Sequence, residues 1–383
     1  MQNAHKVNGR NYIFAASFCM NRRSLLWMLL LLTGLWPANA QIGGKYVYNF
    51  LNISYSSRLM GLGGNLISVH DNDPTLLFTN PSYISERQHN NLALNFTDYF
   101  TTTNAMSAVY SYTFPKAGSF AVGVYGLTYG TFRGADASGI ETGKFNAGDY
   151  ALIVGWGRQL SPNFSIGANL KTIFSHYEAY FSTGIAVDVA GSYYNEDKKL
   201  SLTLLAKNIG TQVKAYAPGN RETLPFDLQF ALSQRLKHVP IRYHISLHSL
   251  YRWDMSYYGL DNPFIETDAI TGEPQYPSKV AQFADNFFRH FVFGIEIEPS
   301  KYFSIQFAYN HNIHQEMKVV SRKTMAGFSY GLQLNIKGIH VGFSRLHYAV
   351  GATPNCFDLA FDFGQLAQNS KERKTRKLEK INP

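Results

Sequence analysis

The stretch that decides the fold is the last apolar segment of the chain, Phe357-Asp358-Leu359-Ala360-Phe361-Asp362-Phe363. Large apolar residues occupy every second position, with Asp358 and Asp362 between them. Successive side chains of a β-strand point to opposite faces, so the pattern predicts a strand with one apolar and one polar face. The chain from residue 291 onward repeats this alternation in segments of about ten residues, which is typical of a membrane-spanning β-barrel.

Two earlier segments alternate in the same way. In residues 224–235 the apolar Phe230 falls on the face opposite Asp227, and in residues 241–248 Ile245 falls opposite Arg242 and His244. A charged side chain on the lipid face near the middle of a membrane costs about 2–4 kcal/mol. We therefore expect the charged positions of these strands to face the lumen and the apolar positions to face lipid.

The pattern predicts an all-β fold, an antiparallel transmembrane β-barrel of about 14 strands with an N-terminal plug. No stretch after residue 40 is long and apolar enough for a spanning helix. A water-soluble β-sandwich would also have short strands, but it would not explain outward aromatic residues or a last strand rich in phenylalanine. The predicted strands are residues 92–103, 105–114, 118–130, 147–160, 164–176, 182–194, 199–210, 223–236, 241–252, 289–298, 302–313, 323–336, 339–349 and 355–363.

The lengths of the connections alternate along the chain. Outer-membrane barrels have short periplasmic turns and longer outer loops, so this alternation places both termini in the periplasm and the protein in the cell outer membrane. The tight connections are residues 115–117, 161–163, 195–198, 237–240, 299–301 and 337–338, and the long ones are residues 131–146, 211–222 and 253–288.

The first forty residues have the layout of a secretory signal peptide. Arg22 and Arg23 precede an apolar run that ends at Trp36, and small residues at 38–40 fit cleavage before residue 41. Because Met20 lies two residues before the arginines, we expect translation to begin there.

Residues 41–90 carry turn formers together with a high apolar content, which predicts a folded plug rather than a free arm. Asp71 and Asp73 could hold calcium, but the other ligand positions of a calcium loop are missing, so a turn is favoured. The expected domains are a signal peptide at 1–40, a plug at 41–90, the barrel at 91–363 and a basic periplasmic tail at 364–383.

Charge is concentrated at the two ends of the chain. The 35 Lys and Arg residues against 26 Asp and Glu residues give +9. Four of the basic residues lie within 1–40, and the segment 371–380 has six basic and two acidic residues, so the barrel itself is nearly neutral. A neutral body argues against a nucleic-acid groove. The tail is expected to be either a solvated end or a contact for anionic lipid.

No catalytic residue, metal ligand or cofactor is expected. Cys356 has no motif around it and is expected to pack. His244 and His248 would share a strand face, while His311 and His314 would lie at a strand end, and neither pair forms a metal-binding pattern. The strand–turn motifs of nucleophilic enzymes are not found.

Several short motifs lie along the chain: Arg58 to Asn65, Asp71-Asn72-Asp73-Pro74, Asn80-Pro81-Ser82, Gly167-Ala168-Asn169-Leu170-Lys171, Lys207-Asn208-Ile209-Gly210, Leu224-Pro225-Phe226-Asp227, Phe293-Gly294-Ile295-Glu296 and Gly327-Phe328-Ser329-Tyr330-Gly331. In this order they resemble the PorQ family of outer-membrane proteins of the type IX secretion system, found in Bacteroidetes. The early segments and the strand at 167–171 are shared with the wider group of long-chain fatty-acid-transporter-like barrels, which includes PorV. One departure is Cys356, since a histidine or threonine is expected before the last strand.

The resemblance implies a fourteen-stranded, plugged, non-catalytic barrel in an attachment complex of the type IX system. Its implied partners are membrane lipid, a PorZ-like surface protein, a PorU-like sortase and a PorV-like barrel, with anionic lipopolysaccharide as a further ligand. In that assembly the barrel would anchor the surface partner and assist export of proteins and their attachment to lipopolysaccharide. The alternative is a fatty-acid-transporter-like channel for hydrophobic small molecules.

The long connection 253–288 is the predicted partner surface, because aromatic side chains are the usual anchors of interfaces. Folding of this connection over the barrel mouth is the competing interpretation. Residues 131–146, with Arg133 and Lys144, are a second candidate contact. The candidate partner-binding residues are Trp253, Tyr257, Tyr258, Phe264, Tyr276 and Phe283.

Overall fold

The computed structural model describes residues 46–256, 266–267, 271, 273–319 and 322–371. The expected signal peptide, the start at Met20 and the last residues of the basic tail lie outside the described residues. Among the helices of the described part, none is long and apolar enough to cross a membrane.

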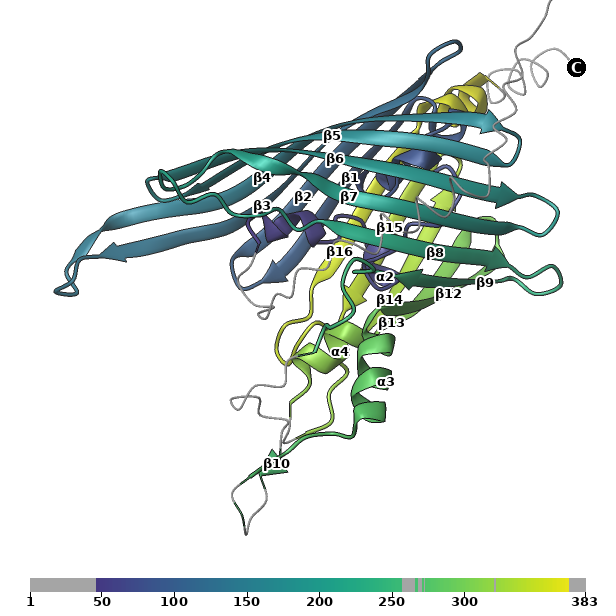
Figure 1. Ribbon diagram of the computed structural model, residues 1–383. Coiled ribbons are helices and arrows are strands. Elements are labelled where there is room, and N and C mark those ends of the chain that lie inside the picture. Colours follow the sequence, from purple (N-terminus) through teal and green to yellow (C-terminus); the bar gives the residue numbers. More distant parts are fainter. Residues whose placement is uncertain (1–45, 257–265, 268–270, 272, 320–321, 372–383) are drawn as a thin grey trace, which may run out of the picture. The chain divides into compact units, whose positions relative to one another are not determined.

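Fourteen antiparallel strands of the described residues close into one barrel (Figure 1). Each strand pairs with its neighbours in sequence, and β1 pairs with β16 to close the wall. The fold class predicted from the alternation is confirmed, and the fold is that of an outer-membrane barrel. The strands are β1 (Asn91–Phe100), β2 (Thr103–Phe114), β3 (Gly118–Ala135), β4 (Glu141–Ser161), β5 (Phe164–Tyr177), β6 (Tyr180–Asn195), β7 (Leu200–Lys214), β8 (Asp227–Arg235), β9 (Ile241–Leu247), β12 (Phe291–Ser300), β13 (Phe303–Asn310), β14 (Phe328–Ile336), β15 (Ile339–Leu346) and β16 (Asn355–Asp362).

The two faces of the strands differ as the sequence predicts. On β16 the side chains of Phe357 and Leu359 are exposed on the outside, while Asp358 between them accepts hydrogen bonds inside the lumen. On β9, Arg242 and His244 face the lumen and approach Glu296 of β12. The outside is therefore an apolar surface suited to acyl chains, whereas the lumenal face carries the charged side chains together with a buried apolar cluster on β1–β6.

The prediction of a long loop at residues 131–146 is wrong for most of that segment. β3 and β4 continue to pair through Thr131↔Asn146 and Phe132↔Phe145 up to Ala135↔Glu141. Glycines at 134 and 143 suggest a loop in the sequence, but they pair with each other, because backbone hydrogen bonds need no side chain. Only residues 136–140 turn, around the Asp136 carboxylate, which accepts from the backbone of Ser138 and Ile140.

Several predicted strands are shorter in the structure. The strand predicted at 302–313 ends at Asn310, whose side chain accepts from the backbone of Ile313 and caps helix α4 (His311–Met317). Likewise β9 ends at Leu247 instead of residue 252, β8 begins at Asp227 instead of residue 223, and β14 begins at Phe328 instead of residue 323. In each case the chain leaves the sheet at the end that carries the long connections.

The six connections predicted to be tight lie at one end of the barrel, although residues 101–102 and 178–179 at the other end are just as short. The six join β2–β3, β4–β5, β6–β7, β8–β9, β12–β13 and β14–β15, and the barrel itself begins and ends at the same rim, with Asn91 paired to Asp362. We call this rim the short-turn end and the opposite rim the loop end. Helix α3 (Lys279–Arg289), α4 and the two-stranded piece formed by β10 (Glu266–Thr267) and β11 (Pro274–Gln275) belong to the loop end.

The segment before the first strand occupies the lumen. We call residues 46–90 the plug. Its elements are η1 (Asn49–Asn52), α2 (Ser57–Gly61), η2 (Pro74–Phe78), η3 (Pro81–Tyr83) and η4 (Glu86–Gln88). Helix α2 packs against β13–β16, η2 against β1–β3 and η3 against β4–β6, so the plug touches most of the wall. Its apolar centre includes Tyr55, which stacks on Tyr125 of β3 at 4.0 Å between ring centroids.

Candidate functional site

Two glycines of the wall leave space for the plug backbone. A Cβ added at Gly157 of β4 would lie 2.2 Å from the carbonyl oxygen of Ile84, and one at Gly167 of β5 would lie 2.3 Å from that of Pro81. No real Cβ tolerates such a distance, so any side chain here must displace η3. The glycine of the segment Gly167 to Lys171 therefore has a direct role in seating the plug.

Polar side chains then fasten η3 and the preceding turn. Asn80 donates from Nδ2 to the carbonyl oxygen of Ile67 at 2.6 Å and to Ser192 of β6 at 3.2 Å. The Tyr83 hydroxyl hydrogen-bonds Ser201 of β7. Asn169 of β5 donates to the carbonyl oxygen of Leu77 at 2.8 Å. Because the bonds with Ser192, Ser201 and Asn169 join the plug to three different strands, the plug cannot leave without breaking them together.

A half-buried carboxylate holds helix α2 at its first turn. Asp358 of β16 accepts from the backbone N–H of Ser57 at 2.7 Å and from the Ser57 hydroxyl at 2.7 Å. Ser56 adds a third donor at 3.2 Å. A carboxylate at a helix N-terminus satisfies N–H groups that the helix leaves unpaired.

A buried charge is compensated within the wall. Lys171 of β5 and Asp188 of β6 form an ion pair of 2.7 Å, and both side chains are almost completely shielded from water. Asn208 of β7 accepts from the Lys171 ammonium and donates its backbone N–H to Asp188, each at 2.8 Å. Asn208 has a positive φ of 59°, so a bulge in β7 brings its backbone to the carboxylate.

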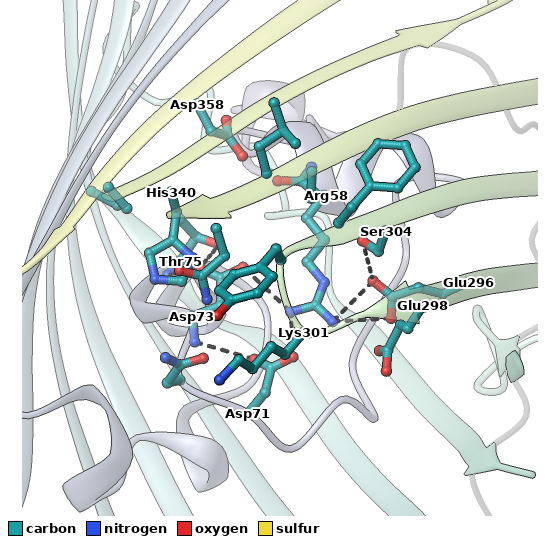
Figure 2. Close-up of a pocket in the computed structure, with 18 of the residues that line it drawn as sticks. Arg58, Asp71, Asp73, Thr75, Glu296, Glu298, Lys301, Ser304, His340 and Asp358 are labelled. Carbon is teal, nitrogen blue, oxygen red and sulfur yellow. Dashed lines mark hydrogen bonds and ion pairs between the residues drawn. The ribbon is translucent and has the colours of Figure 1, made fainter. Parts of the chain in front are cut away.

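Charged residues of the plug and the wall converge near the short-turn end (Figure 2). Arg58 of α2 pairs with Asp71 of the plug and with Glu296 of β12, the latter at 3.1 Å. Arg242 of β9 contacts Glu296 at 3.2 Å and Glu298 at 3.0 Å. We call these five residues the lumen charge cluster. It joins two plug positions to two wall strands.

Ionisation in the plug follows from these contacts. Shielding from water opposes the charge on Arg58, but Asp71 and Glu296 outweigh it, so the pKa of Arg58 lies well above its usual value. Shielding likewise favours neutral Asp71, yet Arg58 and Arg242 lower its pKa below the usual range. The pKa of Asp73 is raised by shielding, with Arg58 opposing and Asp71 adding to the shift. The plug therefore holds one firmly ionised acid beside one that protonates more readily.

The lumen charge cluster borders a cavity of about 300 Å³. The cavity reaches the β12–β13 turn at Lys301 and Tyr302 and the start of β1 at Asn91. Two buried amide oxygens on its wall, Oδ1 of Asn91 and of Asn95, have no hydrogen-bond partner within the described residues. The volume suits several waters or one small molecule, and the lining combines the charged cluster with apolar side chains such as Phe303 and Phe361.

The acidic and thiol side chains considered in the sequence have structural roles. Asp73 caps η2 by accepting from the backbone of Thr75 at 2.9 Å, as favoured for a turn. Cys356 is buried against Met60 of the plug and Leu346 of β15. Within the described residues, no group of three or more His, Cys, Asp or Glu side chains is placed to hold a metal ion.

The histidines also take part in local contacts. His244 hydrogen-bonds Ser233 at 2.6 Å through Nδ1, and His314 hydrogen-bonds the carbonyl oxygen of Ala326 at 2.8 Å. His311 lies 3.6 Å from Asp285 of α3.

The structure brings together two of the candidate partner-binding residues. Trp253 and Phe283 of α3 have ring centroids 5.0 Å apart, and Phe287 joins them. Tyr276 is exposed ahead of the helix. Tyr257, Tyr258 and Phe264 lie outside the described residues. Among the described residues, the aromatic contacts of this connection are centred on α3.

Sequence reasoning did not identify the partners that fasten the plug. Arg58 and Glu296 lie 238 positions apart, and only the closed barrel brings them into contact. The available signal was a charge in the middle of a strand, as at Glu296, Asp188 and Asp358, which requires a lumenal partner. The sequence does not say which partner that is.

No family model matches the chain, and no curated protein matches it either. Among solved structures, the chain is similar to the toluene transporter TodX of Pseudomonas putida, with 10% identity over 80% of this chain and 97% of that one, at a TM-score of 0.47. A FadL homologue of Pseudomonas aeruginosa has 10% identity over 81% of this chain and 98% of that one, at 0.45. The KdgM porin has 7% identity over 71% and 98%, at 0.30. At these identities and scores, the similarities carry no argument about what passes through or binds to this barrel.

Proposed function

We propose that the protein is a closed outer-membrane anchor that holds a partner at the cell surface rather than a conducting pore. The observation that carries this proposal is the fastening of the plug. Residues 46–90 are bonded to strands on opposite sides of the lumen through Asp358, Ser192 and Glu296. At glycines of the wall, the absence of a side chain leaves room for the plug backbone. Breaking all these contacts for each passage event would cost several kilocalories per mole.

The short-turn end faces the periplasm in this proposal, together with both ends of the barrel, and the loop end faces outward. The β3–β4 hairpin extends beyond the end of β4–β5 pairing at Ala147↔Tyr177 and exposes Ile140 near its tip. This hairpin, with Arg133 and Lys144, is the proposed partner contact. The resemblance to PorQ proteins supports a type IX attachment complex as the assembly, with PorZ-like, PorU-like and PorV-like partners and anionic lipopolysaccharide.

Conductance in planar bilayers tests the closed state. The purified barrel is expected to be silent, and the Gly167→Val variant, in which η3 must move, is expected to conduct. Gly191→Val is the matched control, because a Cβ at Gly191 meets nothing nearer than 3.6 Å. Heat-modifiable migration on gels verifies that each variant is folded. Steady conductance by the unmodified barrel would overturn the proposal.

Isolation in mild detergent tests the anchor. Wild-type protein is expected to bring a surface partner with it, and replacing residues 132–144 by a short turn is expected to release that partner while the barrel stays heat-modifiable. Co-isolation that is unaffected by this replacement would remove the hairpin from the interface.

A channel for hydrophobic small molecules is the second candidate, and one observation favours it. The pairing of β7 with β8 ends at Lys207↔Asp227, although β7 continues to Lys214 beside β6. Within the described residues, no strand pairs with the last residues of β7 on this side, and they lie next to the apolar cluster that includes Leu224, on which Tyr216 packs. Uptake of an apolar probe by liposomes that contain the unmodified barrel would support this candidate over the closed anchor.

A further inference from the structure

Helix α3 has its polar and apolar faces reversed with respect to a helix on a water-soluble surface. Its outward side chains are apolar: Val280 is 79% exposed, Phe283 59% and Phe288 47%. Val280, Phe283 and the exposed Phe287 share one face of the helix, because they are three, four and seven residues apart along a period of 3.6, and Phe288 borders that face. The polar face of the helix is turned toward the protein instead.

The buried face is fixed by polar contacts. Asn286 is buried, and its Oδ1 accepts from the backbone N–H groups of Met255 and Ser256, each at 3.0 Å. Arg289 pairs with Asp285 at 2.8 Å, and Asp285 lies 3.6 Å from His311 of α4. The helix therefore cannot rotate its phenylalanines inward without leaving these polar groups unpaired inside the protein.

The apolar face of α3 is continuous with the lipid-facing surface of the barrel. Phe287 of α3 contacts Phe291 at the start of β12 at 4.9 Å, and Phe291 stacks on Phe293 at 5.6 Å. Phe293 and Ile295 belong to the outward face of β12. At the other end of the row, Trp253 packs on Phe283. Figure 1 shows α3 beside the loop ends of β12 and β13.

We propose that α3, together with Trp253, is an interfacial anchor whose aromatic face is buried in the membrane leaflet at the loop end. A helix with an outward apolar face is stable only where that face is removed from water. The aromatic row of α3 continues onto the outward face of β12, which acyl chains already cover. Lipid is therefore the occupant that we assign to the apolar face of α3. Tryptophan and phenylalanine are the residues typical of this depth.

This inference does not depend on the proposed function, since a channel and a closed anchor would both sit in the same leaflet. It reassigns Trp253 and Phe283, which the sequence suggested as anchors for a protein partner. A surface protein covering the same rings is therefore an outcome of the test, rather than part of the proposal.

Spin labels in liposomes distinguish these environments. Single cysteines replace Phe283 or Phe288 in the full chain, with Cys19→Ser and Cys356→Ser in every variant to remove the two native thiols. Phe307→Cys on the outward face of β13 reports acyl chains, and Ile140→Cys at the β3–β4 tip reports water; both side chains are exposed in the structure, at 51% and 66%. The readout is the ratio of collisions with oxygen to collisions with a water-soluble nickel complex.

The labels at 283 and 288 are expected to give ratios several-fold above that at 140 and close to that at 307. A ratio at 283 equal to that at 140 would overturn the inference. So would a label that is accessible to nickel in liposomes and becomes shielded only when a surface protein is added. Since Phe283 and Phe288 are exposed, their replacement leaves the barrel wall intact, and heat-modifiable migration verifies folding.

Discussion

The plug and helix α3 are both short segments fixed against the same barrel, but they use their side chains in opposite ways. The plug turns charged and apolar groups alike toward the wall, through Arg58 and Tyr55, and keeps almost nothing outward. Helix α3 turns Asn286 toward the protein and leaves Phe283 outside. In each case the polar groups mark where the protein provides partners, and the apolar groups mark where water is excluded.

The largest effect is expected at the ion pair in the wall beneath the plug. Lys171→Met leaves Asp188 charged and shielded, which should lower the free energy of unfolding by about 3–5 kcal/mol. Adding Asp188→Asn removes the uncompensated charge and keeps an acceptor for the Asn208 N–H, so the double variant should recover most of the loss. Denaturant unfolding in detergent, followed by tryptophan fluorescence, measures both. A double variant no more stable than the single one would contradict the ion pair as the cause.

A smaller loss is expected at the lumen charge cluster. Arg58→Met removes the partner of Asp71 and one partner of Glu296, but Arg242 remains 3.7 Å and 3.2 Å from these carboxylates. We expect a loss of about 2–3 kcal/mol and faster proteolysis within residues 46–90. Arg133→Met is the control, because Arg133 and Glu141 form a fully exposed pair whose removal should change stability by less than about 0.5 kcal/mol. Equal effects of the two replacements would show that the plug is not held by its charges.

Lowering the pH should destabilise the plug through protonation of His70. Burial, with the nearby Arg87, lowers the pKa of His70 to about 4, while Tyr83 stacks on its ring at 5.3 Å. The unfolded chain then binds the proton more readily, so this contribution is complete above about pH 6.5 and is lost as the pH falls toward 4. The melting temperature should fall by about 3 °C between pH 7 and pH 5, and the fall should be smaller in His70→Phe. An identical fall in both proteins would assign it to other groups.

The smallest effect is expected on α3, where Phe283 is compared with a buried phenylalanine of the plug. Phe78 of the plug is buried in the apolar centre, so Phe78→Ala should cost about 3–5 kcal/mol. Phe283→Ala should change barrel unfolding by less than about 0.5 kcal/mol, because the ring packs mainly on Trp253 outside the wall. Unfolding of both variants in the same detergent checks this. A large loss from Phe283→Ala would mean that α3 is part of the barrel core.

The sequence determined the barrel. Apolar and polar residues alternate with the two-residue period of a β-strand, because one face of each strand meets lipid and the other faces the lumen. The pattern at 357–363 and 241–248 placed Phe357 outside and Arg242 inside, and most strand ends agree to within a few residues. The strand prediction failed at 131–146, where two glycines that suggest a loop are paired with each other across a hairpin. It also failed at Asn310, whose side chain caps a helix that begins inside a predicted strand. Both failures depend on hydrogen bonds that residue type alone does not reveal.

Only the tertiary structure decided which charges meet and which way α3 faces. Arg58 and Glu296 could each have had several partners, and closure of the barrel selects one pairing among residues far apart in the chain. The aromatic residues of 253–288 indicated an interface, but the sequence does not say on which side of the helix the protein lies. Asn286 settles this, because its buried amide accepts from the backbone of Ser256 and leaves the rings facing out. The alternation of apolar and polar residues can be read from the sequence itself, whereas the partner of a buried polar group is determined only by the packed fold.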